Sequence, residues 1–312
     1  MSREESQISG ILSVAIPVLN FGEFLPSTLN SILSQEFGNQ IEILVLDSGS
    51  IDSTFGYMSK LIENFQNVRY VRALNPCGID VDMSRSVDLT ASEYCWLFSG
   101  DDVMHADGLK RVLSEISESK PELILTRHNE CDIRMNFIRE WPILAFDKNS
   151  TFNLSDEASR HEYLANSLTS EAVFSFMSGL IVQKKTWLKH SPASSSIGSN
   201  WAHISRLWTA IRDSDDFTIS YLHQPILNRR GGNDSFSKDG MLSRLSIQIE
   251  GLLNTYEEIF GTKSIEVENL KRLIGNEVFP EWAEAVKAEI DGMAKPVQTR
   301  DRLEALLNRL DI

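Results

Sequence analysis

Short apolar runs alternate with amphipathic segments over the first 130 residues of the chain. The apolar runs have the length and composition of buried strands, and they occupy residues 12–18, 41–46, 94–98 and 122–126. Between them, apolar residues recur three or four positions apart, as on one face of a helix, in segments 25–33, 55–65 and 109–116. Because strands and helices alternate, the sequence predicts an α/β fold with a doubly wound, mostly parallel sheet.

The pattern changes after residue 130. Strands of a mixed sheet are predicted at 136–141, 174–183 and 217–222, and helices at 155–169 and 200–212. From Met241 onward, apolar residues at helical spacing predict a long amphipathic helix, followed by further helical segments to Ile312. This C-terminal helical region either packs on the core or binds a membrane surface or a partner. Its nearly balanced charges weaken the electrostatic part of a membrane anchor.

Polar, turn-rich stretches follow three of the predicted strands. They are residues 17–22 (PVLNFG), 47–52 (DSGSID) and 99–102 (SGDD). In a doubly wound sheet, ligands bind at the carboxyl ends of the strands. We therefore expect the three stretches to meet in one ligand site.

Asp101 and Asp102 are adjacent carboxylates that follow an apolar run directly. Their mutual repulsion and their loss of hydration are unfavourable unless a cation lies nearby. Mg²⁺ or Mn²⁺ suits this position, because such ions bind one or two carboxylates together with phosphate oxygens and water. The alternative is a solvated turn that opens a helix near Ala106, where acidic residues interact favourably with the helix dipole.

Composition limits the class of protein. At 312 residues and 42% hydrophobic content, the chain can form one large domain with an appendage or two modest domains. It has no apolar run of roughly 18 residues and its amino terminus (MSREESQISG) is acidic, so we expect neither a transmembrane helix nor a signal peptide. Its three cysteines form no close pair, which favours a reducing cytoplasm. A formal charge of -14 disfavours nucleic acid and anionic lipid as partners of the whole surface.

Several motifs occur in a fixed order in the amino-terminal half of the chain. They are residues 16–20 (IPVLN), 47–52 (DSGSID), Arg85 and 99–102 (SGDD). In this order they resemble the inverting glycosyltransferases of family 2, which have the GT-A fold, over roughly residues 12–115. The stretches NPCGIDVDMSRSVDLTASEYCWLFSGDD and RRGGNDSF are most similar to the branch of abequosyltransferases and related O-antigen dideoxyhexose transferases.

The resemblance implies a domain organisation. A GT-A domain is expected over residues 1–236, with a nucleotide half at about 11–130 and an acceptor half at about 131–236. The C-terminal helical region then comprises residues 237–312.

The resemblance also implies roles for residues of the nucleotide half. Pro17, Val18 and Asn20 are expected to line the nucleobase pocket, and Asp47 is expected to contact the base or the ribose. Arg85 is expected to contact the nucleotide. Asp101 is expected near the ribose and the metal, and Asp102 on the metal itself. Two positions depart from the family pattern, since Ser48 and Ser99 stand where many members have Asp. A hydroxyl at position 48 does not select the imide edge of uracil, so we expect a cytidine diphosphate sugar as donor. Ser99 leaves one carboxylate fewer for the metal.

Acceptor contacts are implied in the second half of the domain. Ser178 and Gly179 suit a strand of small residues that an acceptor can approach closely. The segment 229–236 (RRGGNDSF) is expected either to close as a mobile lid on a diphosphate or to be an ordinary surface turn. Its candidate binding residues are Arg229, Arg230 and Asn233.

His203 is the predicted general base. An inverting transfer needs a proton acceptor beside the attacking hydroxyl and opposite the leaving group, so the base belongs to the acceptor half. His203 lies in the first turn of the predicted helix 200–212, at the edge of its apolar face, where the helix amino terminus favours the neutral ring. Glu171 and Asp213 are competing candidates, and a purely structural histidine is the other alternative.

The predicted function is transfer of a sugar, a dideoxyhexose in the most similar branch, from a nucleoside diphosphate to a saccharide acceptor, free or lipid-linked. Such a reaction serves O-antigen, lipopolysaccharide or other surface polysaccharide synthesis in the cytoplasm, including the inner face of the membrane. Mg²⁺ or Mn²⁺ is the expected cofactor, and with Arg85 it would stabilise the departing diphosphate. The alternatives are a nucleotidyltransferase, which usually carries a glycine-rich basic phosphate loop not found here, and a non-catalytic protein that binds nucleotide-sugars.

Overall fold

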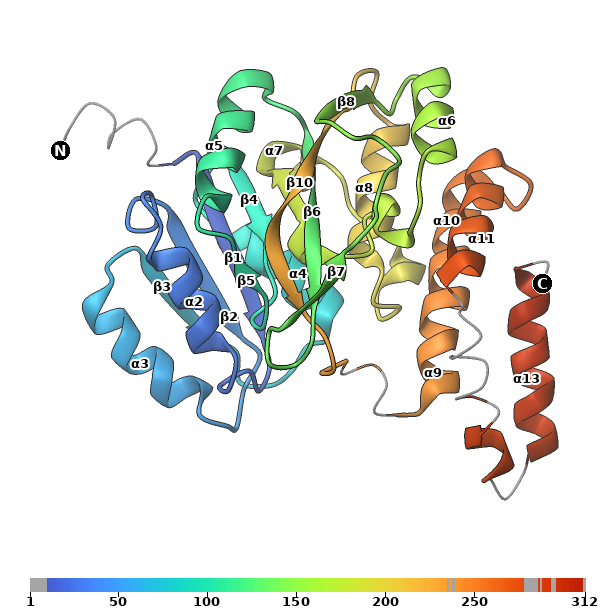
Figure 1. The fold of residues 1–312 in the computed structure, drawn as a ribbon, viewed down its shortest axis with the longest axis horizontal. Coiled ribbons are helices and arrows are strands. Elements are labelled where there is room, and N and C mark those ends of the chain that lie inside the picture. Colours follow the sequence, from blue (N-terminus) through green and yellow to red (C-terminus); the bar gives the residue numbers. More distant parts are fainter. Residues whose placement is uncertain are drawn as a thin grey trace.

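A sheet of ten strands forms the centre of the computed structural model, which describes residues 10–234, 236, 239–277, 286, 288–292 and 296–310. The strand order is β3-β2-β1-β4-β9-β6-β10-β5, with β7 paired to β6 and β8 paired to β10 (Figure 1). Strands β1 to β4 are parallel, whereas β9 runs antiparallel between β4 and β6. The predicted parallel sheet with a mixed extension is confirmed.

The nucleotide half follows the predicted alternation closely. Its strands are β1 (Leu12–Val18), β2 (Glu42–Asp47), β3 (Val68–Arg72) and β4 (Tyr94–Leu97). Its helices are α2 (Leu25–Leu33), α3 (Thr54–Asn64), α4 (Ile79–Leu89) and α5 (Gly108–Ser119). Strand β3 was not expected, because it is an edge strand whose sequence, VRYVR, lacks a continuous apolar run. Helix α4 was not expected either.

The acceptor half differs more from its prediction. Its strands are β7 (Phe137–Glu140), β8 (Ser150–Asn153), β9 (Leu180–Gln183) and β10 (Thr218–Arg230), and they extend the sheet from β5 (Val103–Met104) and β6 (Leu123–Cys131) of the nucleotide half. Its helices are α6 (Glu157–Ala165), α7 (Lys184–Lys189) and α8 (Ala202–Arg212). The helix expected from residue 200 begins at Ala202, because Asn200 has a left-handed φ of 74°.

The strand predicted for residues 174–183 is wrong over its first part. Phe174 has a φ of 75°, and the short helical turn Met177–Gly179 precedes β9. The apolar character of Phe174 instead serves packing, because its ring stacks on Trp208 with a centroid distance of 5.2 Å. Burial alone therefore produced the apolar pattern that had indicated a strand.

Two hydrophobic cores lie on opposite faces of the sheet. One core joins the sheet to α2, α3 and α5 through residues such as Leu29, Met58 and Val112. The other core joins it to α4 and α8 and continues into the C-terminal helices, where it includes Leu253 and Leu270. This second core confirms the expectation that the C-terminal helical region packs on the domain.

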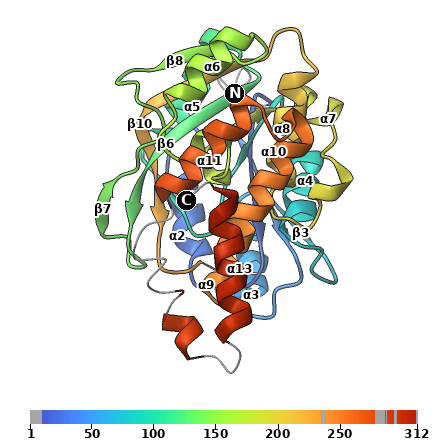
Figure 2. The ribbon, with the colours of Figure 1, turned by 90° about the vertical axis from the view of Figure 1, so that its right-hand side faces the viewer.

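The C-terminal helical region lies on one side of the sheet, where Figure 2 shows it in orange and red. Its helices are α9 (Met241–Ser246), α10 (Leu252–Phe260), α11 (Ile265–Glu277) and α13 (Pro296–Arg309). A π-helical segment, Ile247–Gly251, joins α9 to α10, so the predicted long helix is continuous but carries a local widening. Trp208 of α8 packs against Tyr256 and Phe260 at centroid distances of 5.4 and 5.5 Å.

Candidate active site

The loops after β1 and β2 are tied to each other by hydrogen bonds. The backbone nitrogen of Asn20 donates to Ser50 Oγ at 2.8 Å, and Asn20 Oδ1 accepts from the backbone nitrogen of Ile51 at 2.9 Å. Asn20 itself has a left-handed φ of 62°, a conformation that asparagine tolerates better than most residues. Asn20 thus shapes the loop that follows Pro17 and Val18, two buried residues at the end of β1.

Asp47 is the last residue of β2 and is fully buried. Its Oδ1 accepts from the backbone nitrogen of Ser50 at 2.7 Å, and its Oδ2 accepts from the Tyr70 hydroxyl and lies 3.4 Å from Arg72 Nε. Burial and this carboxylate raise the pKa of Tyr70. The sequence did not reveal Tyr70 and Arg72, although the register of β2 and β3 pairs Asp47 with Arg72.

Near Ser48 and Arg85 lies a further carboxylate, Asp82, that the sequence did not reveal. Asp82 of α4 is buried, which raises its pKa, whereas the Ser48 hydroxyl and the Arg85 charge act in the opposite direction. The role predicted for Arg85 on the nucleotide remains a prediction, and Asp82 is the charged group that its charge affects.

Asp102 is buried behind the end of β4, with 2% of its surface exposed. Its Oδ2 accepts from Ser178 Oγ at 2.6 Å, and its Oδ1 accepts from the backbone nitrogen of Arg230 at 2.9 Å. Burial, and secondly the charge of Asp101, raise the pKa of Asp102 to about 7. The alternative of a solvated turn is therefore wrong for Asp102.

Asp101 is held by residues from two separate parts of the chain, the loop after β4 and the end of β10 with the segment that follows it. Its carboxylate accepts hydrogen bonds from the Ser99 hydroxyl and the Asn233 amide. Arg230 Nε donates to the backbone carbonyl of Asp101 at 2.9 Å. Ser99, which departs from the family pattern, thus orients a carboxylate in place of supplying one.

Arg229 and Arg230 belong to strand β10 and not to a lid. β10 pairs them with Glu130 and Cys131 of β6, so a strand over thirteen residues replaces the shorter strand predicted for 217–222. The expectation of a lid over 229–236 is wrong for these two residues, because long-range pairing with β6 fixes them. Ser235, in the same segment, lies outside the described residues.

Gly179 was expected to let an acceptor approach the backbone closely, but its small size serves another purpose. A Cβ atom at this position would lie 3.3 Å from the backbone oxygen of Thr126, so the glycine allows the turn to pack against β6. Its neighbour Ser178 is fully buried and bonded to Asp102. Together the two residues support the carboxylate from behind.

A cavity of about 270 Å³ opens in front of these carboxylates, and we call it the carboxylate cavity. Its lining combines residues from both halves of the chain. The predicted site residues among them are Asp101, Asp102, His203, Arg229, Arg230 and Asn233.

His203 borders the carboxylate cavity, and its surroundings define which ring nitrogen carries the hydrogen. Its Nε2 lies 3.0 Å from the backbone carbonyl of Phe174, and since a carbonyl only accepts, Nε2 carries the hydrogen. Nδ1 then carries the lone pair, and it is buried without a hydrogen-bond partner among the described residues. Burial lowers the pKa of His203 to about 4, so the ring is neutral near pH 7. The neutral ring was predicted, but burial is its main cause and not the helix terminus.

Asp80 organises the segment that carries His203. Its carboxylate accepts from the backbone nitrogens of Gly198, Asn200 and Ala202 at 2.8, 2.9 and 3.0 Å. Its charge also acts to raise the pKa of His203, against the effect of burial. Asp80 was missed because it lies more than 100 positions away along the chain, and only the fold brings it to the start of α8.

The donor chemistry of the carboxylate pair fits a divalent ion. Within the described ranges, no group of three or more His, Cys, Asp or Glu side chains could hold a metal. Mg²⁺ and Mn²⁺ sites, however, need only one or two carboxylates when phosphate oxygens and water complete the shell. A buried carboxyl with a pKa near 7 beside a second carboxylate is a site where a dication would replace the proton.

The parallel strands bring their loops and carboxylates to one edge of the sheet, and a mixed acceptor half lies beside them. This arrangement is the GT-A fold of glycosyltransferases. Residues 13–163 match the family model described as glycosyl transferase family 2. The chain is also 31% identical to the abequosyltransferase RfbV of Salmonella typhimurium over 281 residues. The aligned region covers 87% of this chain and 80% of RfbV. The chain therefore belongs to glycosyl transferase family 2 and is similar to an abequosyltransferase.

Solved structures share the fold at low sequence identity. TarS of S. aureus, in complex with UDP-GlcNAc, has a TM-score of 0.60 at 15% identity, covering 90% of this chain and 80% of that chain. The mannosyltransferase PcManGT from Pyrobaculum calidifontis, in complex with GDP-Man and Mn²⁺, has a TM-score of 0.53 at 14% identity, covering 96% of this chain and 80% of that chain. Among the described helices, none combines the length and the apolar character that crossing a bilayer requires.

Proposed function

We propose that this glycosyltransferase moves a sugar, with inversion, from a nucleoside diphosphate donor to a saccharide hydroxyl during synthesis of an O-antigen or another surface polysaccharide. The observation that carries the proposal is the carboxylate cavity, which Asp101 and Asp102 line together with His203, a neutral histidine whose Nδ1 has no hydrogen-bond partner among the described residues. Similarity to RfbV supports the polysaccharide context and the dideoxyhexose. Membership of the family decides against the nucleotidyltransferase alternative.

The reaction requires one proton acceptor and one stabilised leaving group. The acceptor oxygen attacks the anomeric carbon, the bond from that carbon to the diphosphate breaks, and the electron pair leaves with the diphosphate. His203 Nδ1 takes the proton of the attacking hydroxyl, while Phe174 holds Nε2 and so fixes the ring. Arg229 and Arg230, which border the same cavity, supply positive charge beside the departing diphosphate.

A divalent ion would be held by Asp102 and Asp101. When bound, it would neutralise charge on the diphosphate as the bond breaks. The protein contributes the Ser178 hydroxyl and the Arg230 backbone nitrogen, which hold Asp102 in place at 2.6 and 2.9 Å.

The experiment measures donor binding and donor use together. A nucleotide-sugar should raise the melting temperature only with Mg²⁺ or Mn²⁺ present, and the bound donor should be hydrolysed slowly in the absence of acceptor. Stabilisation without any hydrolysis indicates a non-catalytic binding protein and contradicts the proposal.

A cytidine diphosphate donor is a separate part of the proposal and depends on Ser48. A titration with the cytidine, uridine, thymidine and guanosine diphosphates in the presence of Mn²⁺ tests it. If uridine diphosphate binds more than about tenfold tighter than cytidine diphosphate, a difference of about 1.4 kcal/mol, the cytidine assignment fails.

A further inference from the structure

A second cavity, of about 440 Å³, adjoins the carboxylate cavity. The two cavities share part of their lining, which consists of Ser175, Phe176, Trp201, Arg229 and Arg244. A molecule in the second cavity would therefore lie directly beside the group that reacts in the first. Its volume falls in the range of small-molecule sites in proteins, roughly 300–1,000 Å³.

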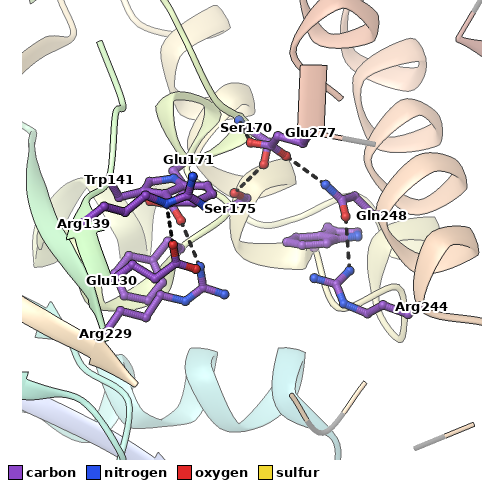
Figure 3. A pocket seen from close by; sticks show the side chains of 12 residues that line it. Glu130, Arg139, Trp141, Ser170, Glu171, Ser175, Arg229, Arg244, Gln248 and Glu277 are labelled. Atoms are coloured by element: carbon purple, nitrogen blue, oxygen red, sulfur yellow. Dashed lines mark hydrogen bonds and ion pairs between the residues drawn. The ribbon is translucent and has the colours of Figure 1, made fainter. Parts of the chain in front are cut away.

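The second cavity has one wall from the sheet side of the domain and one from the C-terminal helical region. Figure 3 shows Glu130, Arg139, Trp141, Glu171 and Arg229 on one side, facing Arg244, Gln248 and Glu277 on the other. The first group belongs to β6, β7, β10 and the segments between them. The second group lies on α9, the π-helical segment and α11.

The helical wall presents polar groups that the fold holds in fixed positions. Glu277 Oε1 accepts from the backbone nitrogen of Ser170 at 2.6 Å, and its Oε2 accepts from Gln248 Nε2 at 2.8 Å. Glu277 and Gln248 are 9% and 6% exposed, and burial raises the pKa of Glu277. Burying an amide and a carboxyl is unfavourable unless hydrogen bonds compensate, so apolar residues would satisfy packing more simply.

Trp201 fixes the register between the helical wall and the segment that carries His203. Its Nε1 donates to the backbone oxygen of Ile247 in the π-helical segment at 2.8 Å. A Cβ atom on Gly251 would lie 2.6 Å from the Trp201 ring, so only glycine admits this approach. The widened helix and the site residue His203 are thus aligned through one shared side chain.

Two of the arginines that line the second cavity are paired with carboxylates, which favours a neutral ligand. Arg139 lies 2.7 Å from Glu130 and Arg244 lies 2.7 Å from Asp234, so an anion would have to compete with these acids. Arg229 borders both cavities, and its charge serves the diphosphate of the carboxylate cavity.

Two features of the lining suit a sugar ring. Trp141, Trp201 and Phe176 line the cavity with aromatic rings, on which the apolar faces of a sugar can pack. One face of Trp141 and one of Phe176 are covered by guanidinium groups, at 4.5 and 5.6 Å from the ring centroids, so a sugar would use the remaining aromatic surface. Glu171 Oε2 is buried and lies 3.3 Å from His128 Nδ1 without forming a hydrogen bond to the described residues, so a ligand hydroxyl would share this oxygen with His128. Burial raises the pKa of Glu171 to about 8, and the protonated carboxyl can donate to a hydroxyl as well as accept from one.

We propose that the second cavity binds the saccharide ring of the acceptor, and that the C-terminal helical region selects this saccharide through Gln248 and Glu277. The proposal rests on the proposed glycosyl transfer, because it assigns the acceptor of that reaction. It gives the C-terminal helices a part in substrate choice in addition to packing.

The test uses the full chain with methyl glycosides of glucose, galactose, mannose and rhamnose as acceptor probes. Glu277→Gln and Gln248→Met should each raise the KM for the best glycoside at least tenfold, with the KM for the donor changed less than twofold. Glu268→Gln, an exposed residue on the same helix α11, is the matched control and should leave both values unchanged. An unchanged acceptor KM in either variant, once circular dichroism shows it folded, overturns the proposal.

A binding measurement separates this proposal from the proposed function. The intrinsic tryptophan fluorescence of the wild type should change on titration with a glycoside, and Trp141→Phe should reduce the change at least twofold. Donor hydrolysis without any fluorescence response to the four glycosides overturns the acceptor pocket but not the glycosyltransferase. A response to glycosides without donor use supports the pocket and counts against the proposed reaction. If pyrophosphate saturates the response and glycosides do not, the cavity is an anion site and the proposal fails.

Discussion

At the end of β2, both carboxylate oxygens of Asp47 have protein partners, whereas His203 Nδ1 and Glu171 Oε2 are buried without a hydrogen bond to the described residues. The loops of the nucleotide half are tied to each other in the same way, through Asn20 and Ser50. Buried polar groups without partners are uncommon in folded proteins, and each calls for an explanation. The difference indicates that the loop around Asp47 is preformed, whereas polar groups elsewhere, including Ser48 Oγ and Asp82 Oδ1 of the nucleotide half, have no hydrogen-bond partner among the described residues.

Asp102→Asn should give the largest effect of a single substitution. We expect turnover to fall by about 1000-fold or more, because one ligand and one charge at the proposed metal site are lost. Ligand-free stability at pH 8 should not fall, because the buried carboxylate with its raised pKa is itself unfavourable there. Turnover and melting temperature, measured with and without a chelator, check both parts. Equal activity of variant and wild type would contradict the assignment of a metal ion to Asp102.

His203→Ala tests the acceptor half directly. We expect kcat to fall by about 100-fold or more, with nucleotide-sugar affinity nearly unchanged, because the base acts on the acceptor and not on the donor. His161→Ala, on the more exposed surface of α6, is the matched control and should keep full activity. A variant that keeps its rate but melts earlier shows that His203 has only a structural role.

Asp47→Asn tests the preformed loop after β2. An asparagine cannot accept from both Ser50 and Tyr70 while facing Arg72, so we expect the unfolding free energy to fall by about 2 kcal/mol. The donor KM should rise as the loop loosens. Denaturant unfolding provides the measurement, and the contrast with Asp102→Asn provides the control. Unchanged stability contradicts the view that Asp47 is mainly a loop anchor.

The raised pKa of Asp102 predicts how donor binding depends on pH. In the folded, ligand-free protein the pKa of Asp102 is about 7, whereas the ordinary value is 3.8. The unfolded chain therefore loses this proton at lower pH than the folded protein does, and the free energy of unfolding falls as pH rises from about 4 to about 7. A dication must displace the proton, so Mn²⁺-dependent binding of a nucleotide-sugar should weaken by up to about tenfold per pH unit below 7. Calorimetric titrations at pH 6, 7 and 8 measure the slope, which Asp102→Asn should remove. A flat profile in the wild type counts against the ion at Asp102.

Local patterns were sufficient to predict most of the nucleotide half. Strand β1 and helix α2 have the predicted bounds, because a continuous apolar run and a single apolar face determine each of them. The edge strand β3 was missed, because its exposed positions carry charge. The segment before β9 was mistaken for a strand, because Phe174 is buried in a turn and periodicity cannot separate the two cases.

The candidate site was predictable where residue type alone suggests chemistry. The candidates Asp101, Asp102 and His203 border one cavity, whereas no residue of the stretch 47–52 lines it. Residues that act through distant partners were not predictable: Asp80 reaches α8 across the fold, and Glu277 meets Ser170 across 107 positions. The arginines of β10 were assigned to a lid because their pairing with β6 depends on tertiary register.

The second core, which continues from the sheet into the C-terminal helices, has a consequence for engineering. Trp208 of α8 rests on Tyr256 and Phe260, so a chain cut after residue 236 would expose a large aromatic surface and should aggregate. A chimera that imports the acceptor preference of a relative must therefore carry α8 and the C-terminal helices as one cassette. The unit of exchange between such enzymes is then the shared core, and the boundaries of a sequence-defined domain are a poor guide to the crossover point.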